Sequence, residues 1–150
     1  MNDIERMRKA KGLQAQFELQ HIYTKDVSFE APFAPEIFQN TWEPKVSMDL
    51  QQECKDLNSE SSEVSLMITV TAKVKEKIAF IAEVKQSGIF IIKNFTGEQK
   101  KQFLNVFCPN LLYPYVRESI SSLVVRGGFA PLYITPVNFE ALYQQKLKNS

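Results

Sequence analysis

The sequence predicts an α+β domain in which a four-stranded antiparallel sheet carries two main helices on one face. Apolar and polar residues alternate along most segments between Phe17 and Ile92, which is typical of half-buried strands. Residues 96–126 and 136–147 instead repeat apolar positions at helical spacing. A length of 150 residues fits one domain. We therefore expect a single domain over residues 1–150, with flexible ends at residues 1–12 and 146–150.

The first predicted strand runs from Phe17 to Ala31, with apolar residues on one parity and polar residues on the other. Ile22 and Lys25 interrupt this alternation, which predicts a bulge or break near Tyr23–Lys25. Prolines then delimit an aromatic loop, with one helical turn expected at residues 35–39.

Three further strands are predicted. Residues 45–50 alternate again, whereas residues 51–62 are polar and predict a mobile linker. The clearest alternation covers residues 63–74, and Lys75-Glu76-Lys77 predicts a hairpin turn to a partner strand that starts at Ile78. Because these strands follow one another along the chain, we expect them in meander order.

The remaining sequence predicts helices. Thr96 and Gln99 fit a capping box for a helix that Pro109 is expected to end. Residues 108–126 predict the longest helix, with Pro114 in its first turn and Gly127-Gly128 at its end. A last helix is expected after Thr135 as N-cap and Pro136 as first residue.

Composition narrows the function classes. The net charge is +1 with both signs interspersed, which argues against a nucleic-acid partner. Cys54 and Cys108 match no metal or redox spacing, which suits a reducing compartment. No apolar segment follows the basic N-terminus, and no apolar run reaches membrane length. We expect a soluble, cytoplasmic protein without a cofactor and without direct membrane insertion.

Catalytic chemistry is not evident in the sequence. The single histidine, His21, lies in a strand pattern without zinc spacing or a neighbouring nucleophile. Cys108 lies at a helix boundary, where a thiolate could be favoured, but a buried small side chain is the simpler interpretation. The glycines lack the strand-loop-helix context of a phosphate site. We therefore do not expect an enzyme.

Several short motifs occur in the order found in the SecB protein-export chaperone family. They are Tyr23-Thr24-Lys25-Asp26, Phe29-Glu30-Ala31-Pro32, Cys108-Pro109-Asn110, Tyr113-Pro114-Tyr115, Arg117-Glu118, Arg126-Gly127 and Pro136-Val137-Asn138-Phe139. The chain resembles this family from about residue 17 to residue 143. The resemblance implies a SecB-like homotetramer, assembled as a dimer of dimers with helices between the sheets. It also implies an ATP-independent holding chaperone that binds unfolded precursor proteins, prevents their aggregation and delivers them to the SecA motor.

The resemblance also implies two binding surfaces. Asp26, Glu30 and Glu83 match family residues that dock SecA, and Ile81 stands where the family has leucine; a merely solvated sheet face is the alternative. The expected surface for unfolded clients comprises Trp42, Val46, Met48, Leu50, Leu142 and Tyr143, for which ordinary core residues are the alternative. Helix faces that the sheet leaves uncovered should contact another copy, and the expected interface residues are Val116, Ser119, Ile120 and Leu123.

The chain departs from the family in its charge. Its isoelectric point is about 7.7 and its last residues are basic, where the family has an acidic tail. Two alternatives to the export function are open, of which the charge concerns the first. One is a SecB-like chaperone dedicated to an antitoxin. The other, from a different class, is a binding protein for small apolar ligands or an enzyme that uses Cys108.

Overall fold

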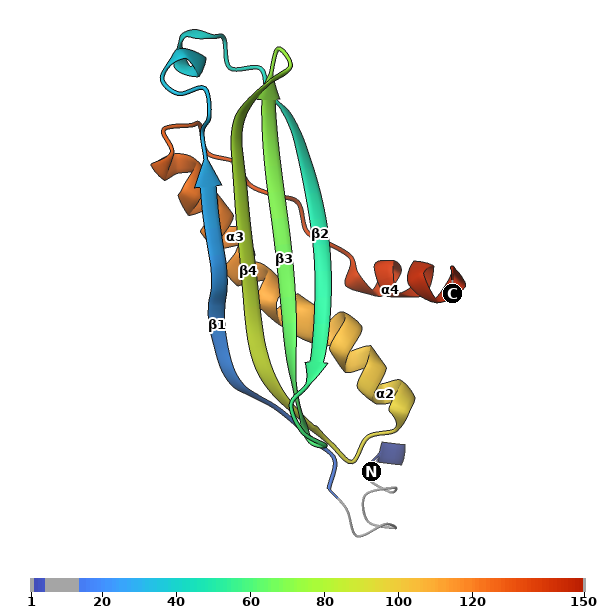
Figure 1. The fold of residues 1–150 in the computed structure, drawn as a ribbon. Helices are drawn as coiled ribbons and strands as arrows, with labels where there is room; N and C mark the ends of the chain where they lie inside the picture. The colour runs from blue at the N-terminus through green and yellow to red at the C-terminus, as the bar shows by residue number, and fades with distance from the viewer. Residues whose placement is uncertain (1, 5–13, 150) are drawn as a thin grey trace.

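The structure is a computed structural model that describes residues 2–4 and 14–149. Its strands are β1 (Gln16–Glu30), β2 (Lys45–Asp56), β3 (Ser61–Val74) and β4 (Lys77–Lys93). Its helical segments are the 3-10 turn η1 (Glu36–Gln39), α2 (Gly97–Gln102), the π-helical turn η2 (Phe103–Phe107), α3 (Cys108–Arg126) and α4 (Phe139–Lys148). The long helix α3 crosses one face of the antiparallel sheet (Figure 1). The predicted α+β class is therefore confirmed.

The strand order is β1-β4-β3-β2, so the predicted meander is wrong for the first strand. β2, β3 and β4 do follow one another, but β1 pairs with β4 at the far edge. The segment between β1 and β2, which contains the expected helical turn as η1, carries the chain across one end of the sheet (Figure 1). Alternation along a strand indicates which face is buried but not which neighbour the strand joins.

β1 contains two bulges where one was predicted. The register with β4 skips Gln20 and Lys25, and the second position confirms the expected irregularity. Each bulge reverses the parity of the residues after it, so Ile22 faces the helix and Tyr23 faces away from it. The second reversal restores the first pattern and places Asp26 on the outer face of the sheet.

The polar segment after residue 50 is strand rather than a mobile linker, which corrects the prediction. β2 continues to Asp56, and β3 begins after a short turn at residues 57–60. In that turn Asn58 Oδ1 accepts hydrogen bonds of 2.9 Å from the backbone N–H groups of Glu60 and Ser61. β2 is an edge strand held in the sheet by backbone hydrogen bonds to β3. Its side chains can therefore be polar without forming a regular buried face.

The helices after β4 form one continuous run, so Pro109 does not end the first of them. The capping box is confirmed, because Thr96 Oγ1 accepts from Gln99 N–H at 3.1 Å and Gln99 Oε1 accepts from Thr96 N–H at 2.9 Å. Further on, the Cys108 N–H bonds to the Phe103 carbonyl, five residues back, as in a π-helix. A proline clashes with the carbonyl four residues before it, and a wider turn ahead of Pro109 accommodates that ring.

The predicted bounds of the longest helix are confirmed. The predicted place of Pro114 in this helix and the predicted N-cap of the last helix are wrong. α3 ends at Arg126, and Gly128 takes the left-handed conformation with φ of 91°. Pro114 lies inside α3 rather than in its first turn. The N-cap of α4 is Asn138 instead of Thr135, because Asn138 Oδ1 accepts from Ala141 N–H at 3.0 Å. α4 extends to Lys148, into the segment expected to be flexible.

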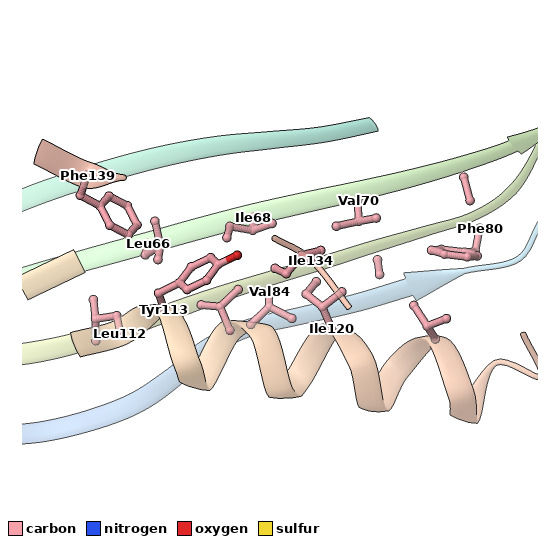
Figure 2. Packing of buried hydrophobic residues seen from close by; sticks show 14 of the residues in the cluster. Leu66, Ile68, Val70, Phe80, Val84, Leu112, Tyr113, Ile120, Ile134 and Phe139 are labelled. Atoms are coloured by element: carbon pink, nitrogen blue, oxygen red, sulfur yellow. The ribbon is translucent and has the colours of Figure 1, made fainter. Parts of the chain in front are cut away.

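The core lies between the sheet and α3. Figure 2 shows side chains of β3 and β4 pointing toward those of α3, and the fully buried ones include Leu66, Ile68, Val70, Phe80, Val84, Leu112 and Ile120. Each such side chain stabilises the fold by about 1.5–3 kcal/mol. Phe139 is also buried, and it fixes the start of α4 beside the Tyr113 ring at 6.0 Å between centroids. The middle of this sheet face, formed by β3 and β4, is thus buried in the core, whereas Val46 and Met48 of the edge strand β2 remain exposed.

Candidate binding surfaces

The sheet face that points away from α3 brings together the four residues expected to dock SecA. Asp26 and Glu30 lie on β1, and Ile81 and Glu83 lie on β4. Glu30 is paired with Ile81 in the register, and Glu83 is paired with Ser28, between the two acidic residues of β1. Their β4 neighbours are buried against the core, so these side chains share the outer face. We call these four residues the acidic face.

The carboxylates of the acidic face differ in their contacts. Asp26 and Glu30 are exposed, whereas Glu83 is half-buried and accepts a 2.7 Å hydrogen bond from Thr69 Oγ1. Lys85 is opposite Asp26 in the register, but its ion pair of 3.1 Å is with a glutamate of β2. Within residues 2–4 and 14–149, no ion pair engages Asp26 or Glu30. Both carboxylates are therefore open to a basic partner.

Another carboxylate of the outer face, Glu63 on β3, is held by two residues of β1. Tyr23 donates a hydrogen bond to Glu63, and Lys25 Nζ lies 3.0 Å from the same carboxylate. The Tyr23 hydrogen bond, with that of Lys25, lowers the pKa of Glu63. Burial, assisted by Glu63, raises the pKa of Tyr23 to about 12. These contacts reach across β4 and involve the bulged Lys25, so they tie β1 to the middle of the sheet.

An aromatic cluster lies where the loop between β1 and β2 meets the end of α3. Phe80 and Phe129 form its buried floor, with ring centroids 5.1 Å apart. Trp42 lies 5.3 Å from Phe129, and Phe38 lies 5.1 Å from the same ring. The side chains of Phe38 and Trp42 remain 49% and 37% exposed, which leaves an open aromatic surface over a fixed base. We call Phe29, Phe38, Trp42, Phe80 and Phe129 the aromatic cluster.

Sequence reasoning identified only Trp42 of this cluster as a site residue. The other four residues come from β1, η1, β4 and the segment after α3, and no spacing in the sequence joins them. The prolines that flank Phe38 and the glycines before Phe129 were the available signals, since both mark loops that expose their side chains. Only the folded chain shows that these loops meet.

Three other residues expected to bind clients form an apolar row on β2. Val46 and Met48 are 44% and 40% exposed, and Leu50 is half-buried. Their partners on β3 belong to the core, so the row points to the same side as α3. It stays accessible because β2 is an edge strand and α3 packs under β3 and β4.

The remaining two expected client residues lie on α4. Leu142 is 41% exposed and Tyr143 is half-buried, on a helix that packs against η2. Cys54 on β2 is exposed as a residue, but partial desolvation of its sulfur raises the pKa of the thiol, and the charge of Lys146 partly offsets this rise. A single groove formed by these two residues and the β2 row stays a prediction.

The residues expected at the oligomer interface lie on two sides of α3. Val116 and Ile120 are fully buried against the sheet of their own chain, so they leave no surface for a second copy. Ser119 and Leu123 are half-buried at the margin of that contact. The outward side of α3 exposes other apolar residues instead, namely Tyr115 and Val125 at 48% and 51%, together with the half-buried Leu111.

The two cysteines are free thiols in different environments. Cys108 is completely buried at the start of α3, and this burial raises the pKa of its thiol well above the usual value. Cys54 is exposed and its Sγ contacts the Leu104 carbonyl at 3.7 Å. Among the described residues, no three His, Cys, Asp or Glu side chains are grouped to hold a metal ion. None of the helices in the same part of the chain has the length and hydropathy of a membrane span.

Comparisons with known proteins agree on one family. The family model "Preprotein translocase subunit SecB" matches residues 10–150. A protein-export protein SecB of Stutzerimonas stutzeri is 52% identical over 133 residues, which cover 89% of this chain and 81% of that protein. Its counterpart in Pseudomonas putida is 50% identical over 139 residues, covering 93% and 86% of the two chains.

A solved structure supports the fold. It is a SecB-like chaperone of Mycobacterium tuberculosis in complex with a peptide from an antitoxin. The TM-score is 0.63 at 18% sequence identity, and the alignment covers 88% of this chain and 95% of that one. At this identity the likeness concerns the arrangement of strands and helices, which agrees with the expected SecB-like fold.

Proposed function

This chain belongs to the SecB family of protein-export chaperones, and we propose that it holds unfolded precursor proteins without ATP and delivers them to the SecA motor. The proposal places this activity in the cytoplasm. Clients bind the aromatic cluster and the apolar row of β2, and the motor binds the acidic face.

The aromatic cluster is the observation that carries the client-binding part of the proposal. Phe38 and Trp42 expose large apolar surfaces, while the buried rings of Phe80 and Phe129 hold them in place. Apolar burial is not directional, so such a surface accepts many client sequences. Val46 and Met48 extend the accessible apolar area along β2. A surface of this kind needs no nucleotide, because binding and release depend only on affinity.

The acidic face supports docking of a basic element of the motor. Asp26 and Glu30 are exposed carboxylates on one strand, and Ile81 adds an apolar contact beside Glu30. Charges at the rim of an interface mainly speed association, and their effect falls as salt increases. With a net charge of only +1, attraction must come from this local group rather than from the whole molecule.

The proposed assembly is a homotetramer, a dimer of dimers. The outward side of α3 supports it, because Leu111, Tyr115 and Val125 present apolar surface that the sheet of the same chain does not cover. Several client surfaces on one tetramer would then hold a long unfolded chain by avidity, even where each contact is weak.

Dilution of a denatured client tests the holding activity. A chemically unfolded precursor is diluted into buffer without ATP, with and without a stoichiometric amount of this protein, and light scattering is followed. We expect scattering to be suppressed by the wild type and to return with a Trp42→Ala, Phe38→Ala double variant. Tyr133→Ala, which removes a 70% exposed ring outside the cluster, serves as the matched control. Unchanged scattering with the wild type would refute the proposal.

A chaperone of the same fold dedicated to one antitoxin is the second candidate. The near-neutral net charge of +1 favours it, because a chain without a large negative charge attracts a basic element of the motor less strongly. Clients that co-purify with the chain decide between the two functions. Many secreted precursors support the export chaperone, and one small antitoxin supports the alternative.

A further inference from the structure

An apolar groove lies between Ile4 of the N-terminal segment and the helical segments α2 and η2. Figure 1 shows α2 at the opposite end of the sheet from the loop that contains η1. The volume of the groove is about 310 Å³. Phe95, Phe103, Val106 and Phe107 form its apolar wall. This volume is at the low end of the range for ligand pockets, about 300–1,000 Å³. The groove therefore suits one large side chain of a peptide rather than a folded element.

The aromatic wall of the groove is already in place. The Phe103 ring lies 4.7 Å from both Phe17 and Phe95, measured between centroids. Phe107 meets Phe17 edge to face at 5.0 Å and is still 45% exposed. Because β1 and the helical run hold these rings together, an incoming side chain does not need to order them first.

Ile4 supplies a further wall of the groove from the N-terminal segment. Its side chain lines the groove and is 39% exposed. Ile4 is far from α2 in the sequence, and its side chain makes the groove more enclosed than α2 and η2 alone would make it.

Two amide side chains give the groove a polar rim. Gln99 Oε1 accepts from the backbone of Thr96, and Gln102 Nε2 donates to Glu140. Within the ranges that the structure describes, Gln99 Nε2 and Gln102 Oε1 make no hydrogen bond. One is a donor and the other an acceptor, which is the complement of a peptide group.

We propose that this groove binds one apolar side chain of an extended peptide, with Gln99 and Gln102 on its backbone and Ile4 as the closing wall. The inference rests on the proposed holding function, because it identifies the ligand as a segment of an unfolded client. It adds a second contact point beyond the aromatic cluster and names a determinant near the N-terminus.

A pair of short peptides tests the groove directly. The probes are the heptapeptides Gly-Ser-Gly-Leu-Gly-Ser-Gly and its Leu-to-Ser counterpart, titrated into the methyl-labelled full-length chain. We expect the leucine peptide to shift the methyl resonances of Ile4 and Val106, and the serine peptide to leave them unchanged. Equal shifts with both peptides, or shifts confined to other methyl groups, would overturn the proposal.

Variants then test the two walls. Val106→Phe should fill the groove and abolish the leucine-specific shifts, and Ile4→Asp should weaken leucine-peptide binding by about threefold to tenfold. Gln14→Glu adds the same charge at an exposed position that does not line the groove, so its affinity should stay within about 1.5-fold of wild type. Unchanged or tighter binding by Ile4→Asp removes Ile4 as a wall. Far-UV circular dichroism confirms that each variant is folded.

The peptide experiment is independent of the holding assay. If the leucine peptide binds the groove but scattering of a denatured client is unaffected, the proposed function fails while the site stands. If scattering is suppressed but Val106 does not respond to the peptide, the groove is wrong and the holding function stands.

Discussion

The ring of Phe29 on β1 lies against the backbone of Gly127 at the end of α3, and a Cβ at Gly127 would stand 2.3 Å from Phe29 Cζ. Phe29 cannot move away freely, because Phe80 and Phe129 lie 5.8 and 6.4 Å from it between centroids. The contact joins the first strand to the end of the longest helix at the base of the aromatic cluster.

Gly127→Ala should therefore destabilise the protein by about 1–3 kcal/mol, the usual cost of overpacking. The measurement is urea unfolding followed by circular dichroism at one protein concentration. Gly97→Ala is the control, because a Cβ there meets no atom of the described residues within 4 Å. Equal stability of the two variants would show that the Phe29 ring yields to the added methyl group.

Client binding at the aromatic cluster should change the fluorescence of Trp42. The chain contains one tryptophan, so its emission reports this surface alone. Since Trp42 is 37% exposed, coverage by an apolar client segment should shift the emission to shorter wavelength. A client that is held without any change in emission must bind elsewhere, which would remove Trp42 from the client surface.

Motor docking should depend on the acidic face. Asp26→Ala and Glu30→Ala together should weaken SecA binding by about tenfold at low salt, and the difference should shrink as salt increases. Isothermal titration at two ionic strengths measures both effects. Asp49→Ala is the matched control, because Asp49 is an exposed carboxylate of the same sheet face on the far edge strand. A loss of affinity equal to that of the control would argue against this docking surface.

The Glu63 cluster should contribute to stability in a pH-dependent way. The folded chain lowers the pKa of Glu63 from its usual 4.5, so the folded state favours the charged form. The stabilisation is fully present above pH 4.5 and is lost as the pH falls through the lower folded value. The unfolding free energy of Glu63→Gln should therefore fall less steeply than that of wild type below pH 4.5. Parallel curves would show that Glu63 is not coupled to folding.

Alkylation should separate the two cysteines. The pKa values of both thiols are raised, but Cys54 is exposed whereas Cys108 is completely buried, so iodoacetamide should modify Cys54 alone in the native protein. Intact mass and peptide mapping measure the modification, and unfolded protein provides the control in which both thiols react. Rapid modification of Cys108 in the folded chain would instead support the alternative of an enzyme that uses this thiol.

The sequence by itself determined which segments are strand and helix wherever a buried face repeats regularly. The longest helix was predicted with its observed bounds, because the apolar spacing ended at a glycine pair, which favours helix termination. The same reasoning failed at residues 51–62, since an edge strand is stabilised by backbone pairing and needs no buried side-chain pattern. It also failed at Pro109, because a π-helical turn accommodates the proline ring within the helical run, and residue spacing does not predict such a turn.

Tertiary structure alone decided which residues meet. The pairing of β1 with β4 brings Asp26 and Glu30 beside Ile81 and Glu83. In a different strand order, β1 and β4 could have been separated by the width of the sheet. The aromatic cluster arises in the same way, because loops that are far apart in the sequence converge beside Phe129. Local pattern specifies the face that a side chain occupies, whereas strand order and chain crossing specify its neighbours, and binding surfaces consist of neighbours.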